Sequence, residues 1–266
     1  MRLLSIASGS GGNSMLVQMD GINILIDAGI SCRRISRALK EHGTSLSALD
    51  AVLITHAHTD HIYGLPALMN KLSCSIYMSR DTHIHTMLNG VTDIIPDVPF
   101  DICGKIRVTP VSAMHDCRGS LGFVLESAGE KLGYLTDTGS IPGKALEIMA
   151  GSDCVVIESN HDSEMLKNGP YPFYLKKRIA SDMGHLSNDA CSEALTALAE
   201  TGTGYFLLAH LSRQNNTPEL ARASAEKALS GFDVETDVLP PETVKQYLIN
   251  EDDLFKQISL EMLNEE

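Results

Sequence analysis

Three histidines and an aspartate lie close together in the segment Thr55-His56-Ala57-His58-Thr59-Asp60-His61. Imidazole nitrogens and carboxylate oxygens are typical ligands of Zn²⁺, Mn²⁺ and Fe²⁺. Alternate side chains of a short loop can point to two neighbouring ions. The competing interpretation is a polar surface loop without a role, but three of the ten histidines of the chain would rarely gather in one such loop. The segment therefore predicts a metal centre.

Three further candidate ligands, His115, Asp137 and His210, each follow a predicted strand. Each has another explanation when taken alone. His115 and His210 could cap an element or hydrogen-bond the backbone, and Asp137 could begin a turn at Asp137-Thr138-Gly139. Taken together with the histidine loop, they favour a centre that holds two ions, because such a centre needs several ligands and one anion that can bridge.

Hydrolysis of a phosphodiester suits a two-ion centre. Two cations about 3.5 to 4 Å apart lower the pKa of a water between them and neutralise charge on the attacking and leaving oxygens. The leaving oxygen also needs a proton. His185 is the candidate general acid, because imidazole titrates near neutral pH. The alternative is a histidine at a helix end that only hydrogen-bonds the backbone.

The segment Glu158-Ser159-Asn160-His161-Asp162 follows another predicted strand. Its polar side chains could orient ligands from behind, join the site or form a turn without a role. We expect His161 and Asp162 to orient ligands.

Residues directly beyond His210 offer a cation and several hydrogen-bond donors beside the predicted metals. Such groups suit the nonbridging oxygens of a phosphate. The expected substrate contacts, with the arginine foremost, are Ser212, Arg213, Asn215 and Asn216.

The predicted elements place these residues on an α/β domain. Strands dominate the first 160 residues and helices follow, an order that fits mixed sheets covered by helices. No repeat and no flexible linker divides the chain, so a single domain over residues 1–266 is expected. Strands are expected at 15–19 and 22–27, joined at Asp20-Gly21, and at 50–55, 75–78, 105–112, 121–127, 131–136, 154–158 and 205–209; helices are expected at 62–71, 81–88, 143–150, 171–182, 188–200 and 218–229.

Composition excludes several classes of protein. The 43% hydrophobic and 21% charged residues are typical of a soluble globular chain rather than a disordered or collagen-like one. No stretch approaches the roughly 18 to 20 apolar residues that cross a bilayer, and no secretory signal is recognisable. Six scattered cysteines favour reduced thiols in the cytoplasm.

Charge distribution leaves a polyanionic partner open. The net charge is −13, yet ten acids and two bases fall in the segment that begins at about residue 232, which we call the acidic C-terminal segment. Basic residues recur with helical spacing between 33 and 40 and cluster at 176–178. Such clusters are usually solvated faces, but they can bind phosphates.

With these motifs in place, the chain resembles the metallo-β-lactamase superfamily, whose HxHxDH motif is followed by a distant His, an Asp and a final His. The resemblance implies an αββα four-layer sandwich with two mixed β-sheets flanked by helices. It implies two divalent transition-metal ions, with Zn, Mn, Fe and Ni all acceptable, and a hydroxide between them as the nucleophile. Asp27 would orient the histidine loop. The implied ligands are His56, His58 and His115 for one ion, Asp60, His61 and His210 for the other, and Asp137 as the bridge, with Asp60 also counted as catalytic.

Further segments resemble the YycJ/WalJ branch of that superfamily, which is associated with 5′ to 3′ exonuclease action on double-stranded DNA. They are 7–14 (ASGSGGNS), 114–116 (MHD), 158–162 (ESNHD), 169–172 (GPYP), 184–188 (GHLSN) and 209–216 (AHLSRQNN). The resemblance implies a nucleic-acid substrate, DNA foremost. Ala57 and Cys117 depart from the pattern expected of relatives, and neither is an expected ligand.

Two other kinds of function stay open at this point. The same centre could hydrolyse a small-molecule phosphodiester, a thioester or a lactone. A metal-stabilised interaction module without catalysis is the non-enzymatic alternative, although structural zinc sites usually have four closed ligands.

Overall fold

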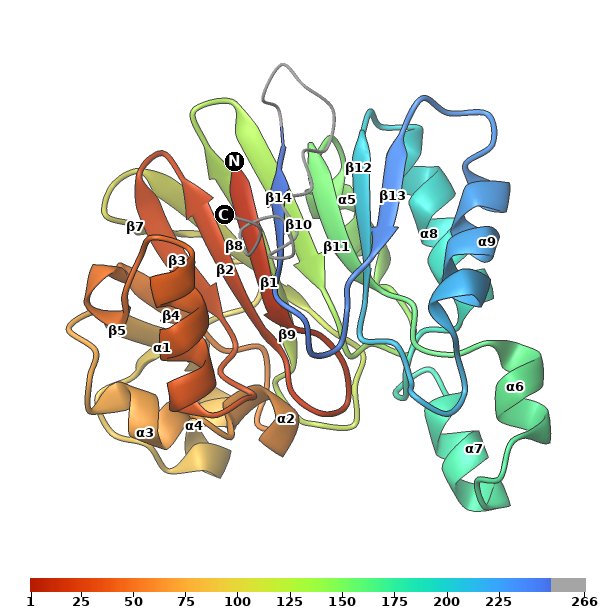
Figure 1. The fold of residues 1–266 in the computed structure, drawn as a ribbon, viewed down its shortest axis with the longest axis horizontal. Helices are drawn as coiled ribbons and strands as arrows, with labels where there is room; N and C mark the ends of the chain where they lie inside the picture. The colour runs from red at the N-terminus through yellow and green to blue at the C-terminus, as the bar shows by residue number, and fades with distance from the viewer. Residues whose placement is uncertain (250–266) are drawn as a thin grey trace, which may run out of the picture.

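A computed structural model, which describes residues 1–249, contains two β-sheets packed face to face with helices on both outer sides (Figure 1). Each sheet has seven strands. The layers follow the order helix, sheet, sheet, helix. This arrangement confirms the expected four-layer sandwich of two mixed sheets.

The first sheet combines an antiparallel half with a parallel half. Strands β14, β1, β2 and β3 pair antiparallel, and β3 to β6 pair parallel. The strands, in spatial order, are β14 (Lys245–Leu248), β1 (Arg2–Ala7), β2 (Ser14–Met19), β3 (Ile22–Ile26), β4 (Ala51–Leu53), β5 (Ser75–Ser79) and β6 (Thr92–Ile94).

The second sheet repeats this mixture in reverse. Strands β7 to β10 pair antiparallel, and β10 to β13 pair parallel. The strands, in spatial order, are β13 (Glu235–Val238), β12 (Tyr205–Ala209), β11 (Cys154–Glu158), β10 (Glu130–Leu135), β9 (Leu121–Ser127), β8 (Ile106–Ser112) and β7 (Phe100–Ile102).

Helices cover the outer face of each sheet. Helix α1 (Cys32–Glu41), α2 (Thr59–Ile62), α3 (Leu65–Met69) and α4 (Arg80–Thr86) lie on the side of the first sheet, and α5 (Gly143–Met149), α8 (Asn188–Ala199) and α9 (Pro218–Ala228) on that of the second. A short 3₁₀ helix spans Leu46–Ala48. The remaining helices, α6 (Ser163–Asn168) and α7 (Phe173–Ile179), extend away from the layers (Figure 1).

Three apolar layers hold the sandwich together. Neighbouring strand residues face opposite sides of a sheet, so Ile24 packs between the sheets with Phe123, whereas Leu25 packs under α1 against Ile35. The third layer lies between the second sheet and helices α5, α8 and α9. Because both sheets are buried on both faces, the strands read as continuous apolar runs in the sequence.

The structure corrects several expected boundaries. The expected helix 62–71 corresponds to the shorter α3, and only its first residue lies in α2. The two helices are separated at Gly64, whose backbone N–H donates to Ala28 and which packs against the carbonyl of Ile30 without room for a side chain. The expected strand 50–55 ends at Leu53, because the backbone N–H of Thr55 donates to a carboxylate instead of to a strand.

The acidic C-terminal segment is partly structural. It contributes β13 to the second sheet and β14 to the first, where β14 pairs with β1. The sequence did not predict these strands, because their acidic residues resemble a solvated tail. Residues 250–266 of the segment lie outside the described part of the chain.

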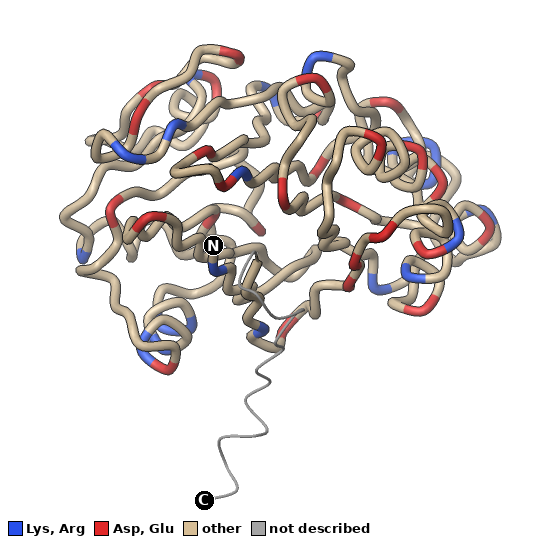
Figure 2. Tube along the Cα trace, turned by 90° about the horizontal axis from the view of Figure 1, so that it is seen from above, with Lys and Arg blue, Asp and Glu red and all other residues tan. Residues whose placement is uncertain are grey.

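Surface features agree with the composition. Acidic and basic residues are interspersed along the trace (Figure 2). The six cysteines form no disulfide within residues 1–249. In the same range, no helix has both the length and the apolar character needed to cross a bilayer.

Candidate metal centre

Four loops bring the expected ligands together at one edge of the sandwich. The histidine loop follows β4, and single residues follow β8, β10 and β12. These strands run in the same direction within their sheets, so their carboxyl ends meet at the lower edge in Figure 1. Ligand sites of α/β sheets form at such carboxyl ends.

One histidine cluster consists of His56, His58 and His115. Their ring centroids are 4.7 to 5.1 Å apart, and one nitrogen from each lies close enough to the others for all three to bind one ion. Asp116 lies beside this cluster, with its Oδ1 3.5 Å from Nε2 of His115, and it forms an ion pair with Arg178 of α7.

A second cluster consists of Asp60, His61 and His210. Oδ2 of Asp60 lies 3.7 Å from Nε2 of His61 and 3.6 Å from Nε2 of His210. The three residues can hold one ion. Asp137 lies between the clusters, with its Oδ2 3.1 Å from Nε2 of His61 and its Oδ1 4.0 Å from Nε2 of His115.

Several buried polar atoms of the site have no hydrogen-bond partner among the described residues, and their chemistry indicates whether the site fits metal ions. Nε2 of His56, Nε2 of His210 and Oδ2 of Asp137 are buried and have no hydrogen-bond partner within residues 1–249. Buried polar atoms are normally paired. These three are a carboxylate oxygen and two imidazole nitrogens, which are the donors that divalent transition metals prefer, so the residues fit such ions.

Asp27 fixes the orientation of the histidine loop from below. Its fully buried carboxylate accepts hydrogen bonds from Nδ1 of His61, at 2.7 Å, and from the backbone N–H and hydroxyl of Thr55. The hydroxyl of Thr55 lies 3.0 Å from Nδ1 of His56, from which it can accept. Because a carboxylate only accepts, Nδ1 of His61 carries the proton. The lone pair of His61 is then on Nε2, which lies 2.9 Å from Nδ2 of Asn13 and 3.7 Å from Oδ2 of Asp60.

Glu158, at the end of β11, occupies a corresponding place on the other sheet. Its buried Oε1 lies 2.8 Å from Nδ1 of His185 and 3.1 Å from Nδ1 of His210. Its Oε2 accepts from the backbone N–H of Thr138, at 2.8 Å. Glu158 thus contacts both an expected ligand and the candidate proton donor. The sequence signal was the polar segment directly after a buried strand, but it did not distinguish Glu158 from its neighbours.

The centre has a strongly negative character. Burial disfavours a charged ring, but Asp137 and Asp27 outweigh it and raise the pKa of His61 well above its usual value. Burial also opposes ionisation of Glu158, yet His185 and His210 lower its pKa to about 2. Buried carboxylates that stay ionised at neutral pH favour the binding of cations.

Three residues of the site have left-handed backbone conformations. Asp27, Asp137 and His210 have φ angles of 60°, 54° and 54°. Such angles are unfavourable for residues other than glycine and recur at functional sites, where the surrounding structure enforces them. Each residue lies one or two positions after the end of a strand, in the turn that leaves the edge of the sheet.

His185 lies beside both clusters. Its ring centroid is 5.1 Å from that of His115 and 5.3 Å from that of His210. Glu158 outweighs the effect of burial and raises the pKa of His185, which keeps the ring protonated to higher pH. Because Nδ1 donates to Glu158, Nε2 is the nitrogen that can reach a substrate.

The side chains of His161 and Asp162 make no hydrogen bond to an expected metal ligand within residues 1–249. Oδ1 of Asp162 accepts from the backbone N–H of Met165 and caps α6. His161 holds the loop through its backbone, since its carbonyl accepts from Asn188. Its Nδ1 has no partner within the described residues, and its ring lines a cavity beside α7. Asp27 and Glu158 are the buried carboxylates that hydrogen-bond histidines of the centre from behind.

The four expected substrate contacts divide into two kinds. Asn215 and Asn216 are buried, and their side chains bond within the protein: Nδ2 of Asn215 lies 3.3 Å from Oγ of Ser212, and Nδ2 of Asn216 donates to Ser159 and Asn188. The expectation that they face the substrate is therefore corrected to a role in holding the loop. Ser212 and Arg213 line cavities, and Arg213 forms an exposed ion pair with Glu242.

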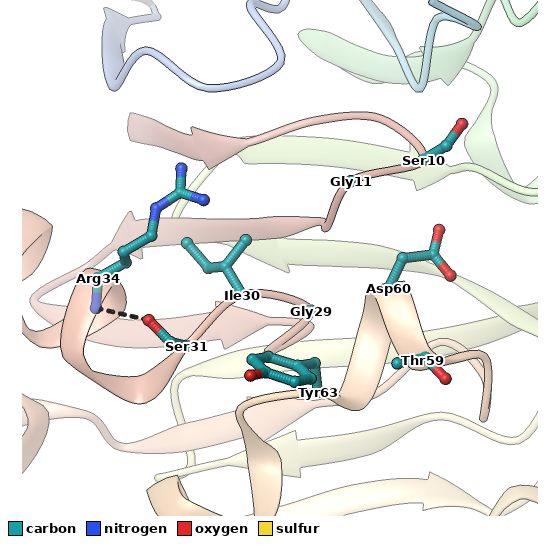
Figure 3. A pocket seen from close by; sticks show the side chains of 9 residues that line it. All are labelled: Ser10, Gly11, Gly29, Ile30, Ser31, Arg34, Thr59, Asp60 and Tyr63. Atoms are coloured by element: carbon teal, nitrogen blue, oxygen red, sulfur yellow. Dashed lines mark hydrogen bonds between the residues drawn. The ribbon is translucent and has the colours of Figure 1, made fainter.

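An open groove adjoins the centre on the side of Asp60, and we call it the Asp60 groove. Figure 3 shows its walls, with the loop of Ser10 and Gly11 opposite the ring of Tyr63, and with Arg34 at the far end from Asp60. Its volume is about 470 Å³. The ring of Tyr63 is 65% exposed, so a ligand that leaves the centre along this groove meets an aromatic surface and a cation.

Fold, site and comparisons define the class of this protein. The family model of the beta-lactamase superfamily domain matches residues 22–211. The chain belongs to the metallo-β-lactamase superfamily and is a metal-dependent hydrolase of that class.

Within the superfamily it belongs to the YycJ/WalJ branch. It is 34% identical over 242 residues to exodeoxyribonuclease YycJ of Bacillus anthracis, with 86% of this chain and 90% of the relative covered. It is also 34% identical over 238 residues to exodeoxyribonuclease WalJ of Streptococcus pneumoniae, with 86% and 88% covered. The crystal structure of Zn²⁺-bound PqqB from Methylobacterium extorquens has the same fold, with a TM-score of 0.69, 17% identity, and 92% of this chain and 99% of that chain covered.

Proposed function

We propose that this protein is a dinuclear metal-dependent phosphodiester hydrolase that acts as a 5′ to 3′ exonuclease on double-stranded DNA. The proposal rests on two adjoining clusters of possible metal ligands with Asp137 between them. Several of their nitrogen and oxygen atoms are buried without a hydrogen-bond partner within residues 1–249. A structural zinc site needs only four closed ligands. Two adjoining clusters beside a candidate proton donor exceed that need and favour catalysis.

The ligands divide between two ions. His56, His58 and His115 would hold one ion, and Asp60, His61 and His210 would hold the other. Asp137 would serve both, since its carboxylate lies 3.1 Å from His61 and 4.0 Å from His115. When bound, two such cations supply a hydroxide nucleophile at neutral pH and neutralise charge on the attacking and leaving oxygens.

The chain's own side chains perform the other steps. His185 gives the proton on Nε2 to the leaving oxygen, and Glu158 keeps that ring protonated and oriented through Nδ1. Asp27 holds the histidine loop in place. Hydrogen bonds from Nδ1 of His61 to Asp27 and from Nδ1 of His185 to Glu158 fix the orientation of both rings, which reduces the reorganisation needed during the reaction.

The nature of the substrate rests on the relatives and on the surfaces beside the centre. Both relatives are named exodeoxyribonucleases. The Asp60 groove provides Arg34 and Tyr63, and Ser212 and Arg213 follow His210 directly. A cation suits a phosphate, and an aromatic ring suits a base. A reaction on DNA, together with unpaired cysteines in the described residues, favours the cytoplasm as its location.

The decisive experiment is incubation of the purified protein with Mn²⁺ and 5′-phosphorylated duplex DNA, matched RNA, cyclic dinucleotides and bis-p-nitrophenyl phosphate. We expect hydrolysis of DNA and of the nitrophenyl ester. The Asp60→Ala variant should lose both, whereas Asp101→Ala, which removes an exposed carboxylate from the edge strand β7, should lose neither.

The outcomes separate the competing functions. Cleavage of cyclic dinucleotides without cleavage of DNA would identify a small-molecule phosphodiesterase. Equal rates for Asp60→Ala and the unmodified protein on every substrate would overturn the catalytic proposal itself.

A further inference from the structure

A small cavity lies directly beside the proposed proton donor, and we call it the α7 chamber. It has a volume of about 300 Å³ and is lined by His115 and His185 of the centre, by Tyr171, Leu175 and Arg178 of the α7 region, and by Ser212. The chamber therefore adjoins the metal clusters on the side of His185, whereas the Asp60 groove adjoins them on the side of Asp60. Ser10 lines both cavities, so its loop separates them.

The walls of the chamber combine an apolar surface with polar groups. Leu175 and Ile179 are four residues apart on α7, which places them on the same helix face, and Tyr171 precedes that helix on the same cavity. Asn160 and Ser212 supply an amide and a hydroxyl on the same cavity. Asp116 and Arg178, which form an ion pair, also line the cavity, so polar and charged groups surround a smaller aromatic and aliphatic patch. Such a lining suits a ligand that combines a ring with polar groups.

The size of the chamber limits what can enter. A volume of 300 Å³ stands at the lower end of the ~300 to 1,000 Å³ range of small-molecule sites. It is therefore a chamber for one nucleotide, not for a run of them. The Asp60 groove, at about 470 Å³, leads along the surface past Tyr63 towards Arg34 and can hold a continuing chain (Figure 3).

We propose that the α7 chamber holds the single terminal nucleotide that leaves, and that the Asp60 groove holds the rest of the strand. This inference rests on the proposed nuclease function. In an in-line displacement the leaving oxygen must lie next to the group that protonates it, and His185 lines the chamber but not the groove. The two cavities thus assign a direction to the strand across the centre.

The assignment fixes which bond breaks. An oxygen from water forms the new bond to phosphorus, and the bond between phosphorus and the 3′-oxygen of the terminal nucleotide breaks. That oxygen takes the proton from Nε2 of His185. The terminal nucleotide leaves with a 3′-hydroxyl, and the shortened strand keeps the phosphate at its new 5′ end.

The first test is product mapping with the Mn²⁺-loaded full chain and a duplex labelled at its 5′ end. We expect mononucleotides with a 3′-hydroxyl from the first turnover onward, identified by mass spectrometry, and a 5′-phosphate on the remaining strand. Dinucleotides or longer fragments as the first products, or a phosphate on the 3′ side of the released nucleotide, would overturn the assignment.

The second test changes the chamber wall. Tyr171→Ala removes a ring on which the terminal base can lie, so kcat/KM on duplex DNA should fall about 10-fold, while Tyr171→Phe should retain most of it. Leu175→Trp fills the chamber and should reduce DNA cleavage further. The matched control is Tyr174→Ala, on the same helix, because Tyr174 is 74% exposed and does not line the chamber.

Hydrolysis of bis-p-nitrophenyl phosphate separates this inference from the proposed function. Its nitrophenolate leaves without a proton donor and is smaller than a nucleotide, so Tyr171→Ala should lower its rate less than it lowers kcat/KM on duplex DNA. Unchanged DNA cleavage by Tyr171→Ala and Leu175→Trp would sink the chamber assignment alone. Absence of DNA cleavage by the unmodified, Mn²⁺-loaded protein would reject the nuclease function and the assignment together.

Discussion

Oε1 of Glu158 lies 2.8 Å from Nδ1 of His185, although the two residues belong to different elements and are separated by 27 positions. The same oxygen lies 3.1 Å from Nδ1 of His210. One buried carboxylate therefore contacts both a proposed metal ligand and the proposed proton donor. A change at Glu158 should act on the acid–base step through His185, and this can be measured.

The Glu158→Gln variant should lose activity at alkaline pH. Glu158 outweighs burial and raises the pKa of His185, so the ring of the unmodified protein stays protonated to higher pH. A neutral amide removes that effect, the pKa of His185 falls, and the protonated donor is lost at lower pH. We expect the alkaline limb of kcat/KM against pH on DNA to move to lower pH.

Two controls isolate the proton donor in this experiment. The alkaline limb on bis-p-nitrophenyl phosphate should stay in place, because nitrophenolate needs no proton. Glu158 also contacts His210, so the substitution could weaken metal binding. Saturating Mn²⁺ and a measured metal content show that both proteins carry the same amount of metal. An identical shift on both substrates would show that Glu158 acts on the metals instead of on His185.

The sequence predicted the five central strands of the second sheet, β8 to β12, because they read as apolar runs, but it did not predict the edge strand β7. Strands β9, β11 and β12 begin and end where the sequence placed them. Strands β13 and β14 were missed because Glu235, Asp237 and Lys245 break the apolar pattern. Asp237 forms ion pairs with Lys245 of β14 and Arg222 of α9, and a local pattern cannot reveal such distant partners.

The candidate site shows the same division. The histidine loop was recognisable because its residue types are concentrated, and the geometry brings His115, Asp137 and His210 to it. The role of Glu158 depends on a contact between β11 and the loop before α8, and the buried side chain of Asn216 bonds Asn188 of α8. Both are tertiary contacts between distant segments, and the sequence alone does not indicate which segments meet.

Metal binding should raise the stability of the folded protein. An ion present at 100 times its dissociation constant contributes about 2.7 kcal/mol to the free energy of unfolding, which corresponds to a rise in Tm of about 5 to 10 °C for a domain of this size. Calorimetry of the chelator-treated protein with and without Mn²⁺ measures this. Asp137→Asn should show a smaller rise, because the variant lacks the proposed bridging charge, and a rise equal to that of the unmodified protein would contradict the bridge.

Asp27→Asn should lower metal affinity without removing a ligand. The amide keeps the volume of the carboxylate, but its N–H can donate to Nδ1 of His61 and move the ring proton to Nε2, the nitrogen proposed to bind metal. Loss of such an orienting group typically costs about 10- to 100-fold in metal affinity. Competition with a chelator of known affinity measures it, with Asp101→Asn as the control. Equal affinities would remove Asp27 from the proposed site.

Gly29→Ala should disturb the centre from the backbone. A methyl group at position 29 would overlap the backbone carbonyl oxygen of Asp60. Neither group can move aside unless the backbone itself shifts. The loop that carries Asp60 must then move, so we expect a lower Tm and a reduced metal content. Gly21→Ala is the control, because a methyl group at this turn meets no neighbour. The φ of 75° at Gly21 is strained for alanine, so this variant serves as a control for the metal content and not for Tm. Normal metal content in Gly29→Ala would contradict the argument.

Asp237 should make stability depend on pH independently of the metal centre. Its carboxylate in β13 accepts from Tyr247 and Lys245 of β14 and from Arg222 of α9, and these partners outweigh burial and lower its pKa. A carboxylate with a lowered pKa stabilises the fold above its unfolded pKa of about 3.9, and this contribution disappears as the pH falls through the folded pKa.

Asp237→Asn should therefore unfold more easily at pH 7, by about 1 to 3 kcal/mol, and the difference from the unmodified protein should shrink below about pH 4. Urea unfolding at several pH values measures both. Asp233→Asn is the control, because Asp233 makes no side-chain hydrogen bond or ion pair that the structure records within residues 1–249. If the difference in the free energy of unfolding persisted unchanged at pH 3, the charge of Asp237 would not be the source of its stabilising effect.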